Sequence, residues 1–582
     1  MDSLRQLAMK FLQKKEGEKY HFQKDFLMPF YDTWKKCHNF YTKEYIIICI
    51  NNLLNNYSKN IKSGWDVILS IFKEVAKMDN EENIQKQILN VLYDISKNNY
   101  NEIKDIFKDL TSCLIEFTSK HQEEVMKIIE NFVEQVEDET NFNILLECYK
   151  SFITDNDEKI RNEGLNNLLE CFNKKFKNPK SNLYLSCKKE KFWEFILIQL
   201  LINIVEELKV KITILSINNN NQSNSSTFYT NYYSNSNTII NNNEFNTNNN
   251  NYFNNNIEYH NDEKEKLSAF LQKLLIKIGD LFNDYFSYNY KFLGKFFEEL
   301  ESLVFYYEEK VQSASLECII FLNESEKMKN MSFLRPYVLF LTKLADKSLE
   351  KDFLNIDMHI LKYDYKKYND IIDINIFYCY LHLKILTLLD KLIEENIDIL
   401  GEDDLNKILN CLENSFDISI KFNKSIELRL LITDNLKSGN IVVLFKQMQI
   451  SIKIYFFILE HLFNDNSSFQ SKQNYYKKMI ETSIKILNNF AESNKEYYDI
   501  INKPLNKNRD EREIKEKEKI IKHHSYPITN QIFPIMEKVL FFKFDKYKEL
   551  ITKSLLELII CQNEEIRKKV KEILSSIYNK LT

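Results

Sequence analysis

The chain has 582 residues, a formal net charge of −5, and only 7 glycines and 6 prolines. A chain of this length with average composition would hold roughly 40 glycines and roughly 30 prolines. Sheets, barrels and sandwiches need many tight turns, and those turns rely on these two residues. The composition therefore predicts an all-α protein with short connections, and it excludes collagen, a disulfide scaffold and a chain disordered throughout.

Charge and hydropathy patterning exclude further classes. A net negative charge disfavours nucleic-acid binding, because that function needs a basic face to neutralise phosphates. The opening, MDSLRQLAMKF, lacks the apolar run of a signal peptide. The longest apolar stretch, 192–205, is interrupted by polar residues and is shorter than the roughly 20 residues that span a bilayer. We expect a cytosolic or nuclear protein without a transmembrane segment, peripheral at most on a membrane.

Apolar residues recur at helical spacing along nearly the whole chain. The segment 45–50 (YIIICI) would suit a buried strand by itself, but the apolar pattern continues at helical spacing to Tyr57. Near the other end of the chain, an apolar stripe runs from Ile566 to Leu581 along one side of a helix. Both segments are therefore predicted to be helices. The second carries lysines beside its stripe, so it either contacts a membrane surface or, as we favour, caps the fold.

A weak internal repeat runs through the sequence. Four segments begin with acidic or amide residues, continue with Ile or Val, and then place Gln or Arg before an apolar stripe. The four pairs are Ile84-Gln85, Ile160-Arg161, Val311-Gln312 and Ile566-Arg567. The acidic start suits a helix N-terminus, and a spacing of 76 residues between the first two pairs is about twice an armadillo or HEAT repeat. Because helical hairpins must stack to bury their apolar faces, we predict an armadillo/HEAT-like α-solenoid.

Two segments interrupt this pattern. Residues 218–256 hold 19 asparagines in 39 positions and lack the apolar periodicity of a folded element, which predicts a disordered Asn-rich insertion. It is either a prion-like interaction tract or a tolerated low-complexity expansion, since longer loops add little closure entropy. The charged stretch 506–524 is predicted to be an exposed helix or a mobile linker.

These patterns divide the chain into six parts. The predicted parts are N-terminal helical repeats (1–210), the Asn-rich insertion (211–262), further helical repeats (263–325), a C-terminal helical region (326–505), a charged linker or exposed helix (506–525) and terminal helical hairpins (526–582).

No pattern of catalytic or metal-binding residues is apparent. The glycines are too scattered for a phosphate-binding loop, and the ten cysteines, none in a CxxC pair, suit small core residues in a reducing compartment. His523 and His524 would diverge by about 100° on a helix and are expected to face solvent. Glu402, Asp403 and Asp404 are expected to begin a helix rather than bind a cation. We predict no enzyme, no cofactor and no metal.

The first thirty residues carry a family resemblance. The stretch DSLRQLAMKFLQKKEGEKYHFQKDFLMPF (2–30) resembles the large, brefeldin-A-inhibited type of Arf guanine-nucleotide exchange factors of the trans-Golgi and endosomes. In that family it follows the catalytic Sec-seven domain and begins the first downstream homology region. The motif from Asn60 to Trp65 is similar to the family's N-I-R-S-G-W. Weaker resemblances to the second downstream and C-terminal regions cover 150–210 and 263–465, and beyond about 470 only helical repeats are expected.

The resemblance implies the regulatory helical half of such a factor without its catalyst. The family's catalytic glutamate lies in the Sec-seven domain, and no candidate for it is found in this sequence. The downstream regions of the family are implicated in autoinhibition, membrane recruitment and binding of activated small GTPases. The resemblance therefore implies a non-catalytic scaffold of Golgi or endosomal vesicle transport. Its partners would be Arf- or Rab-type GTPases or a catalytic exchange partner, and it would be cytoplasmic and peripheral on trans-Golgi or endosomal membranes.

Candidate partner-binding residues are taken from where the resemblance is densest. They are Gln23, Lys24, Asp25, Lys62 and Trp65. Trp65 either anchors a partner or locks two helices together, and the second interpretation is favoured. Asp25 is also expected to cap its helix. The alternatives are a karyopherin-like transport receptor, a fragment of a full-length exchange factor with its catalytic domain upstream, an exchange enzyme of unrecognised sequence, and a remnant without function.

Overall fold

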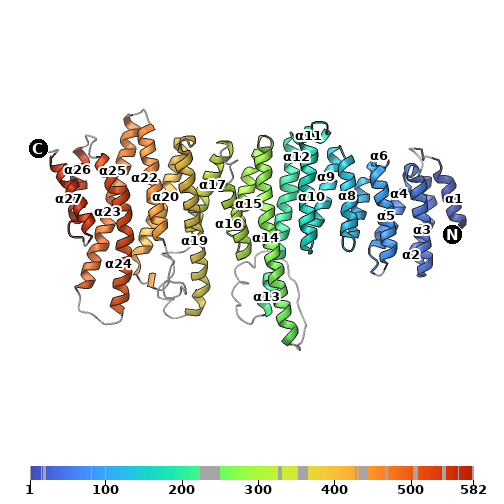
Figure 1. Cartoon of the computed structure of the whole chain (residues 1–582), viewed down its shortest axis with the longest axis horizontal. Coiled ribbons are helices and arrows are strands. Elements are labelled where there is room, and N and C mark those ends of the chain that lie inside the picture. The colour runs from blue at the N-terminus through green and yellow to red at the C-terminus, as the bar shows by residue number, and fades with distance from the viewer. Residues whose placement is uncertain are drawn as a thin grey trace. The chain divides into compact units, whose positions relative to one another are not determined.

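The computed structural model describes most of the chain. The described residues are 2–14, 16–17, 21–79, 81–98, 100–222, 250–324, 331–350, 365–426, 429–430, 444–465, 469–502, 509–539, 545–561 and 563–579. Every regular element among them is helical, which confirms the predicted all-α class (Figure 1). They form two compact units, Met1–Leu322 and Asn323–Thr582, called unit 1 and unit 2 below. The six-part division of the chain stays a prediction.

Unit 1 consists of helices joined by short connections. Its elements are α1 (Asp2–Leu12), α2 (Phe22–Lys36), α3 (Phe40–Tyr57), η1 (Ser58–Asn60), α4 (Gly64–Ala76), α5 (Glu82–Asn98), α6 (Tyr100–Ile103), η2 (Lys104–Ile106), α7 (Phe107–Phe117), α8 (Gln122–Gln135), α9 (Glu139–Ile153), α10 (Glu158–Phe176), α11 (Asn182–Ser186), α12 (Glu190–Trp193), the π-helical η3 (Glu194–Ile202), α13 (Asn203–Gln222), α14 (Asn250–Asn289), η5 (Tyr290–Phe292), α15 (Leu293–Val304) and α16 (Glu309–Glu324).

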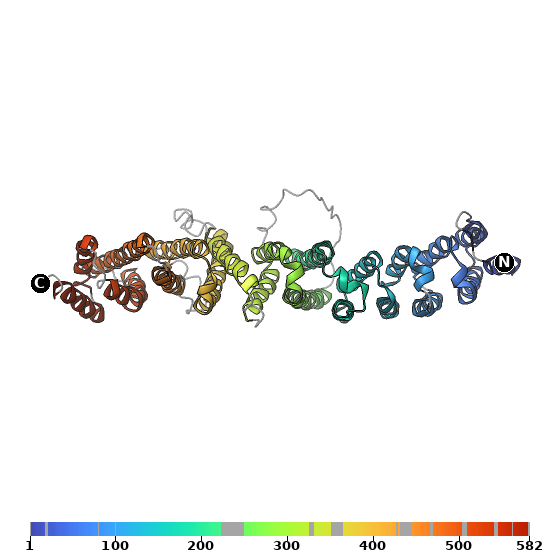
Figure 2. The same ribbon diagram turned by 90° about the horizontal axis from the view of Figure 1, so that it is seen from above.

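The helices of unit 1 stack in two rows. One row contains α2, α4, α7, α9 and η3 in contact with one another, and the other contains α1, α3, α5, α8, α10 and α14. Figure 2, which looks nearly along many of these helices, shows them following one another in chain order. Each hairpin buries its apolar side between the rows, as Phe72, Phe107 and Leu146 illustrate at 0% exposure. The predicted armadillo/HEAT-like α-solenoid is confirmed for this unit.

The prediction that the segment 45–50 is helical is confirmed. The segment lies in α3, where the side chain of Asn39 caps the start by accepting a hydrogen bond from the Thr42 N–H at 3.2 Å. Ile46, Ile50 and Leu53 are at most 1% exposed. The helical continuation of the apolar pattern, rather than the local β-branched run, therefore decides the structure.

The four copies of the internal repeat occupy the same place in their helices. Gln85, Arg161, Gln312 and Arg567 are each the fourth residue of a helix, in α5, α10, α16 and α27 (Glu564–Asn579). Each side chain reaches back to a main-chain carbonyl six or seven residues earlier, and those carbonyls belong to Met78, Asp155, Tyr306 and Cys561. The connection after a helix leaves carbonyls without intrahelical partners. The repeated Gln or Arg therefore satisfies them and fixes the hairpin turn.

Unit 2 is also entirely helical among its described residues. Its elements are α17 (Met331–Glu350), α19 (Tyr365–Asn396), η7 (Ile397–Ile399), α20 (Glu402–Lys424), α22 (Phe445–Asp465), α23 (Phe469–Ile501), α24 (Arg509–Pro527), the π-helical η8 (Ile528–Ile532), α25 (Phe533–Val539), α26 (Asp545–Glu557) and α27. The predicted helix starts at 402–404 and at 564 are confirmed. The stripe of α27 is buried at Ile566, Val570, Ile573 and Ile577 and half-buried at Leu574, whereas Leu581 lies outside the described residues.

The two predicted interruptions have different outcomes. Of the Asn-rich insertion, residues 223–249 lie outside the described residues, and its ends are helical, since α13 reaches Gln222 and α14 begins at Asn250. The charged stretch forms α24 over its described residues, 509–524. That helix packs on α22 and α23 and buries Glu516 and Ile520 at 3% and 4% exposure. The helix alternative is therefore confirmed over these residues and the linker alternative is wrong, but the helix is only partly exposed, because one side of it belongs to the core.

Candidate functional site

Four polar side chains join the α1–α2 connection of unit 1 to the α3–α4 connection. They are Glu16, Gln23, Asn60 and Ser63, called the N-terminal polar knot below. Glu16 is 3% exposed, and its carboxylate accepts hydrogen bonds from the N–H groups of Gln23 and Ser63, both at 3.0 Å, and from Ser63 Oγ at 2.8 Å. One buried carboxylate thus holds the starts of α2 and α4 together.

The rest of the knot ties the α3–α4 connection to its neighbours. Gln23 is 1% exposed and bonds that connection twice, donating to the Asn60 carbonyl at 2.8 Å and accepting from the Lys62 N–H at 2.7 Å. Asn60 Nδ2 donates to the carbonyl of Leu12 at the end of α1, at 3.0 Å. The Asn60–Trp65 motif therefore encodes a local structure in which Asn60, Lys62 and Ser63 bond residues up to 48 positions away.

Packing beneath the knot explains the Gly–Trp pair. A Cβ on Gly64 would lie 2.8 Å from Leu27 Cδ1 and 3.2 Å from Ile61 Cγ2, so glycine permits the close approach of α2. Trp65 is 1% exposed. The favoured interpretation, that Trp65 locks helices together, is confirmed by this burial, and a direct partner contact by its ring would require the unit to open.

The remaining candidates lie on the surface around the knot. Lys24, Asp25 and Lys62 are exposed, and Lys24 Nζ pairs with Asp66 at 3.2 Å. Such an exposed ion pair contributes about 0–1 kcal/mol. The prediction that Asp25 caps α2 is wrong, because the helix begins after His21. The first N–H groups of α2 bond Glu16 and Ser63 instead, and no sequence spacing pointed to either partner.

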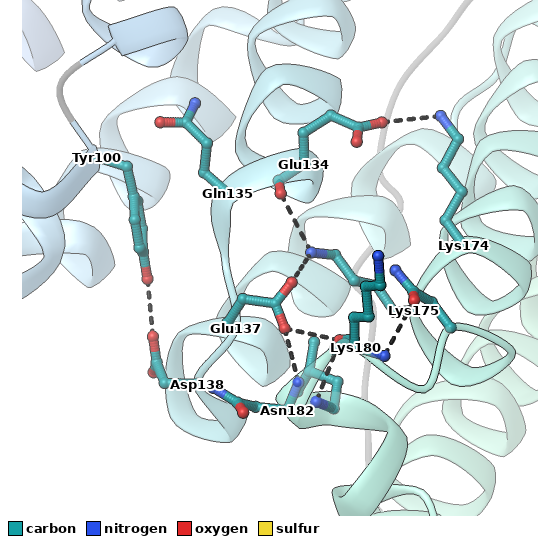
Figure 3. Close-up of polar contacts among 12 residues, drawn as sticks. Tyr100, Glu134, Gln135, Glu137, Asp138, Lys174, Lys175, Lys180 and Asn182 are labelled. Atoms are coloured by element: carbon teal, nitrogen blue, oxygen red, sulfur yellow. Dashed lines mark hydrogen bonds and ion pairs between the residues drawn. The ribbon is translucent and has the colours of Figure 1, made fainter.

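A second polar cluster lies between α8 and α11. Figure 3 shows Glu137 directed at Lys175 and at the start of α11. Its Oε1 lies 2.5 Å from Lys175 Nζ, and its Oε2 accepts from Ser181 Oγ at 2.7 Å and from the Asn182 N–H at 2.9 Å. Burial by itself would raise the pKa of Glu137, but the hydrogen bonds from Lys175 and Ser181 hold it below its ordinary value. All partners come from this chain, so the cluster fastens two connections.

Unit 2 contains a buried chain of serine and histidine side chains. His382 Nδ1 lies 2.9 Å from Ser348 Oγ, its Nε2 lies 2.7 Å from Ser415 Oγ, and Ser415 Oγ lies 2.8 Å from Ser451 Oγ. A serine beside a histidine can form a nucleophile and its base. Here all four residues are at most 2% exposed, so a substrate has no access. The chain joins α17, α19, α20 and α22, and sequence spacing did not predict it.

Acidification should destabilise unit 2 through its buried histidines. Burial lowers the pKa of His382 from 6.5 to about 4. Between these values the unfolded chain binds the proton and the folded chain does not, so stability is present above pH 6.5 and falls as the pH drops towards 4. Burial also lowers the pKa of His524, to about 3, which acts in the same direction.

This pH dependence can be measured by hydrogen exchange of α19 and α20. We expect protection to fall between pH 7 and pH 5, and to fall less in His382→Gln. The same substitution at His461, which is only partly buried, should leave the pH dependence unchanged. Equal acid sensitivity in all three proteins would contradict the assignment.

The prediction that His523 and His524 face solvent is wrong. His524 is 5% exposed, with its Nε2 3.4 Å from Asn423 Nδ2. The His523 ring stacks on Phe445, with centroids 4.4 Å apart. A cavity beside His524, also lined by Met448 and Phe490, measures about 10 Å³, which is the lower limit for one water molecule. His524 belongs to the interior of unit 2 and His523 is half-buried against Phe445, because α24 is a packed helix.

The described residues can be compared with the predictions about cysteines, metal sites and membrane-spanning segments. Nine of the ten cysteines are buried and Cys37 is half-buried, all with free thiols, which confirms the prediction of core cysteines. Over the described part of the chain, no three His, Cys, Asp or Glu side chains are arranged to hold a metal ion. No described helix has both the length and the apolar character to cross a membrane.

These features define a helical-repeat protein whose polar clusters fasten its hairpins. Two parts of the chain match known families. Residues 10–87 match the Mon2/Sec7/BIG1-like HDS family, and residues 380–575 match the BIG2 C-terminal domain. The chain therefore carries regions related to the brefeldin A-inhibited, BIG-type Arf guanine-nucleotide exchange factors.

Individual relatives cover only a short stretch. Brefeldin A-inhibited guanine nucleotide-exchange protein 4 of Arabidopsis thaliana is 34% identical over 123 residues, which are 20% of this chain and 7% of that protein. Protein 1 of the same name from Homo sapiens is 36% identical over 121 residues, or 20% of this chain and 6% of the relative. The ADP-ribosylation factor guanine nucleotide-exchange factor SEC7 of Saccharomyces cerevisiae is 37% identical over 121 residues, 20% of this chain and 6% of its own length.

These matches confirm part of the resemblance and extend it. The resemblance of residues 2–30 is confirmed from residue 10 onward, and that of the Asn60–Trp65 motif in full, by the match over residues 10–87. The C-terminal resemblance reaches residue 575, so the expectation of only helical repeats beyond about 470 is wrong. Beyond that point the single sequence shows only degenerate apolar stripes, which do not reveal the family relationship. The resemblance over 150–210 stays a prediction. The karyopherin alternative is not favoured, since the sequence matches lead to exchange factors.

Similar solved structures are distant. The crystal structure of Kap121p bound to Pho4p is 12% identical, covers 95% of this chain and 58% of that chain, and has a TM-score of 0.23. The Chaetomium thermophilum cohesin loader SCC2 fragment is 10% identical, covers 95% of this chain and 42% of that chain, and has a TM-score of 0.25. Likeness at this level carries nothing about function.

Proposed function

We propose that this chain is a non-catalytic helical-repeat regulator of Arf-type exchange, working by binding a small GTPase or an exchange partner at Golgi or endosomal membranes. The observation that carries the proposal is the HDS match at residues 10–87, which includes the N-terminal polar knot and the surface around it. The buried serine–histidine chain, closed to solvent, offers no alternative as an active site.

The binding surface proposed here consists of the exposed residues beside the knot. Lys24 and Lys62 supply positive charge, while Asp25 and Asp66 supply acceptors next to them. Gln23 supports this surface from below, because its side chain fixes the main chain at Asn60 and Lys62. Of the five candidates, Lys24, Asp25 and Lys62 would touch the partner, and Gln23 and Trp65 would position them.

A binding assay tests the surface. The full chain should bind a GTP-locked Arf-family protein more tightly than its GDP-locked form. Lys24→Glu with Lys62→Glu should weaken that binding by about tenfold, because charges at the rim of an interface steer the two partners together and raise the association rate. Lys59→Glu, an exposed lysine in η1, is the matched control and should bind normally. Unchanged binding by the double variant would refute the surface, and no binding by the unaltered chain to any GTPase would refute the function.

A nucleotide-release assay tests the absence of catalysis. The isolated chain should leave the release of labelled GDP from an Arf-family protein at its spontaneous rate. Clear stimulation by the chain, lost on dilution below its binding constant, would show exchange activity and overturn the proposal.

A further inference from the structure

The turn between α2 and α3 presents two aromatic rings to solvent. Phe40 and Tyr41 are the first two residues of α3, and they are 40% and 77% exposed. Their ring centroids lie 5.9 Å apart in an edge-on arrangement. Ile48 continues the outward face of Tyr41 two turns along the helix, at 41% exposure. Aromatic area this accessible at a turn contributes little to the core of unit 1.

Lysines flank these rings on both sides. Lys35 and Lys36 end α2, and Lys43 lies in the first turn of α3. Two of the three ammonium groups sit over aromatic rings of the same hairpin, Lys35 at 4.8 Å from the Tyr31 centroid and Lys43 at 4.9 Å from that of Trp34. These contacts hold the positive charge close to the turn.

The charge of this turn differs from that of two equivalent turns. Of the other connections that lead from the α2–α4–α7–α9 row to the opposite row, two carry acidic residues, Asp79 before α5 and Asp155 and Asp157 before α10, whereas the α7–α8 connection, 118–121, has none. Between Asp32 and Glu44 the sequence has no acidic residue. The N-terminal 78 residues hold 13 Lys and Arg against 8 Asp and Glu, although the whole chain holds 79 against 84.

We propose that the α2–α3 turn docks on an anionic membrane surface. Phe40 and Tyr41 would enter the headgroup region, where amphipathic rings are favoured, and Lys35, Lys36 and Lys43 would bind lipid phosphates. An acidic protein or a nucleic acid would use the lysines, but a turn offers no concave pocket to enclose two protruding rings, whereas a fluid lipid surface takes them up without one. The membrane is therefore the partner that uses both features.

This inference goes beyond the proposed function because it concerns the opposite end of the same hairpin. Lys24 lies at the start of α2 and Lys62 follows the end of α3, whereas Tyr41 lies at the start of α3. An 18-residue helix separates its two ends by about 27 Å. A membrane at the turn would therefore leave the surface beside the polar knot free for a protein partner.

Vesicle flotation with the full chain tests the proposal. The chain should float with vesicles of phosphatidylcholine mixed with phosphatidylserine, bind weakly to phosphatidylcholine alone, and lose binding as salt rises. Phe40→Ser with Tyr41→Ser, and separately Lys35→Glu with Lys36→Glu, should each reduce binding to the anionic vesicles by about tenfold or more.

Matched controls distinguish docking at this turn from non-specific effects of exposed apolar area and of net charge. Leu185→Ser removes another apolar side chain of unit 1, 63% exposed, and Lys59→Glu with Lys188→Glu makes the same charge change at exposed sites elsewhere in unit 1. Both controls should bind vesicles normally. Equal losses in test and control variants, or lysine dependence without ring dependence, would overturn the proposal. The Phe40→Ser, Tyr41→Ser variant should still bind the GTPase normally. A loss of vesicle binding by this variant would then test membrane docking separately from the proposed function.

Discussion

Replacing Glu516 with alanine should destabilise unit 2 by about 3–5 kcal/mol, because it leaves a buried guanidinium without its counter-charge. Arg429 Nε donates to Glu516 Oε2 at 3.2 Å, and the two side chains are 6% and 4% exposed. Arg429 also lies 4.1 Å from the ring centroid of Phe445 and donates to Asn423 Oδ1 at 2.5 Å, so it cannot turn out to solvent without breaking these contacts.

The measurement must follow unit 2 itself. All three tryptophans lie in unit 1, so hydrogen exchange of α20, α22 and α24 is the appropriate reporter. Glu511→Ala, an exposed position of the same helix, should change stability by less than about 0.5 kcal/mol. Replacing both partners, Arg429→Met with Glu516→Leu, should recover much of the loss. A Glu516→Ala protein as protected as Glu511→Ala would rule out a structural role for the pair.

Replacing Glu16 with alanine should loosen the first hairpins of unit 1 by about 3 kcal/mol. Two N–H groups and one hydroxyl would lose their acceptor. A hydrogen bond to a charged group contributes about 1.5–3 kcal/mol net, and bonds that share one acceptor do not add up independently. The amides of Gln23 and Ser63 should exchange faster, and Trp65 fluorescence should report earlier unfolding. Because repeat proteins unfold in parts, the amides of α9 and α10 should change little.

Two variants frame this result. Glu16→Gln keeps an acceptor oxygen and should lose about half as much stability, while Glu102→Ala alters an exposed carboxylate of the same unit and should have almost no effect. If amide exchange at Ser63 is as slow in Glu16→Ala as in the unaltered chain, the polar knot does not hold the two connections together.

Much of the fold could be predicted because helical periodicity is a local property. The stripe of α27 and the start of α20 depend on residues within a few turns, and both were predicted at the right place. The repeated Gln or Arg could be located from the sequence, but its role could not. The carbonyl that it bonds is only six or seven residues away, yet that bond exists only when the turn has its folded shape.

The parts that were missed depend on partners distant in sequence. Ser63 lies 47 residues from Glu16, and Glu516 lies 87 residues from Arg429. Charge density by itself assigned α24 to solvent, whereas one buried arginine brings a glutamate of that helix into the core. Gln23 and Trp65 were chosen for resemblance, and their burial shows that a family signal can mark a scaffold as readily as a contact.

The self-contained turns of the repeat have an evolutionary consequence. Since Gln85, Arg161 and Gln312 each satisfy carbonyls within their own hairpin, a duplicated or deleted hairpin would carry its complete turn with it. Gene lineages could then lengthen or shorten this array in whole modules while keeping the ends recognisable. Homologues are accordingly expected to differ by complete helical pairs rather than by insertions inside a helix.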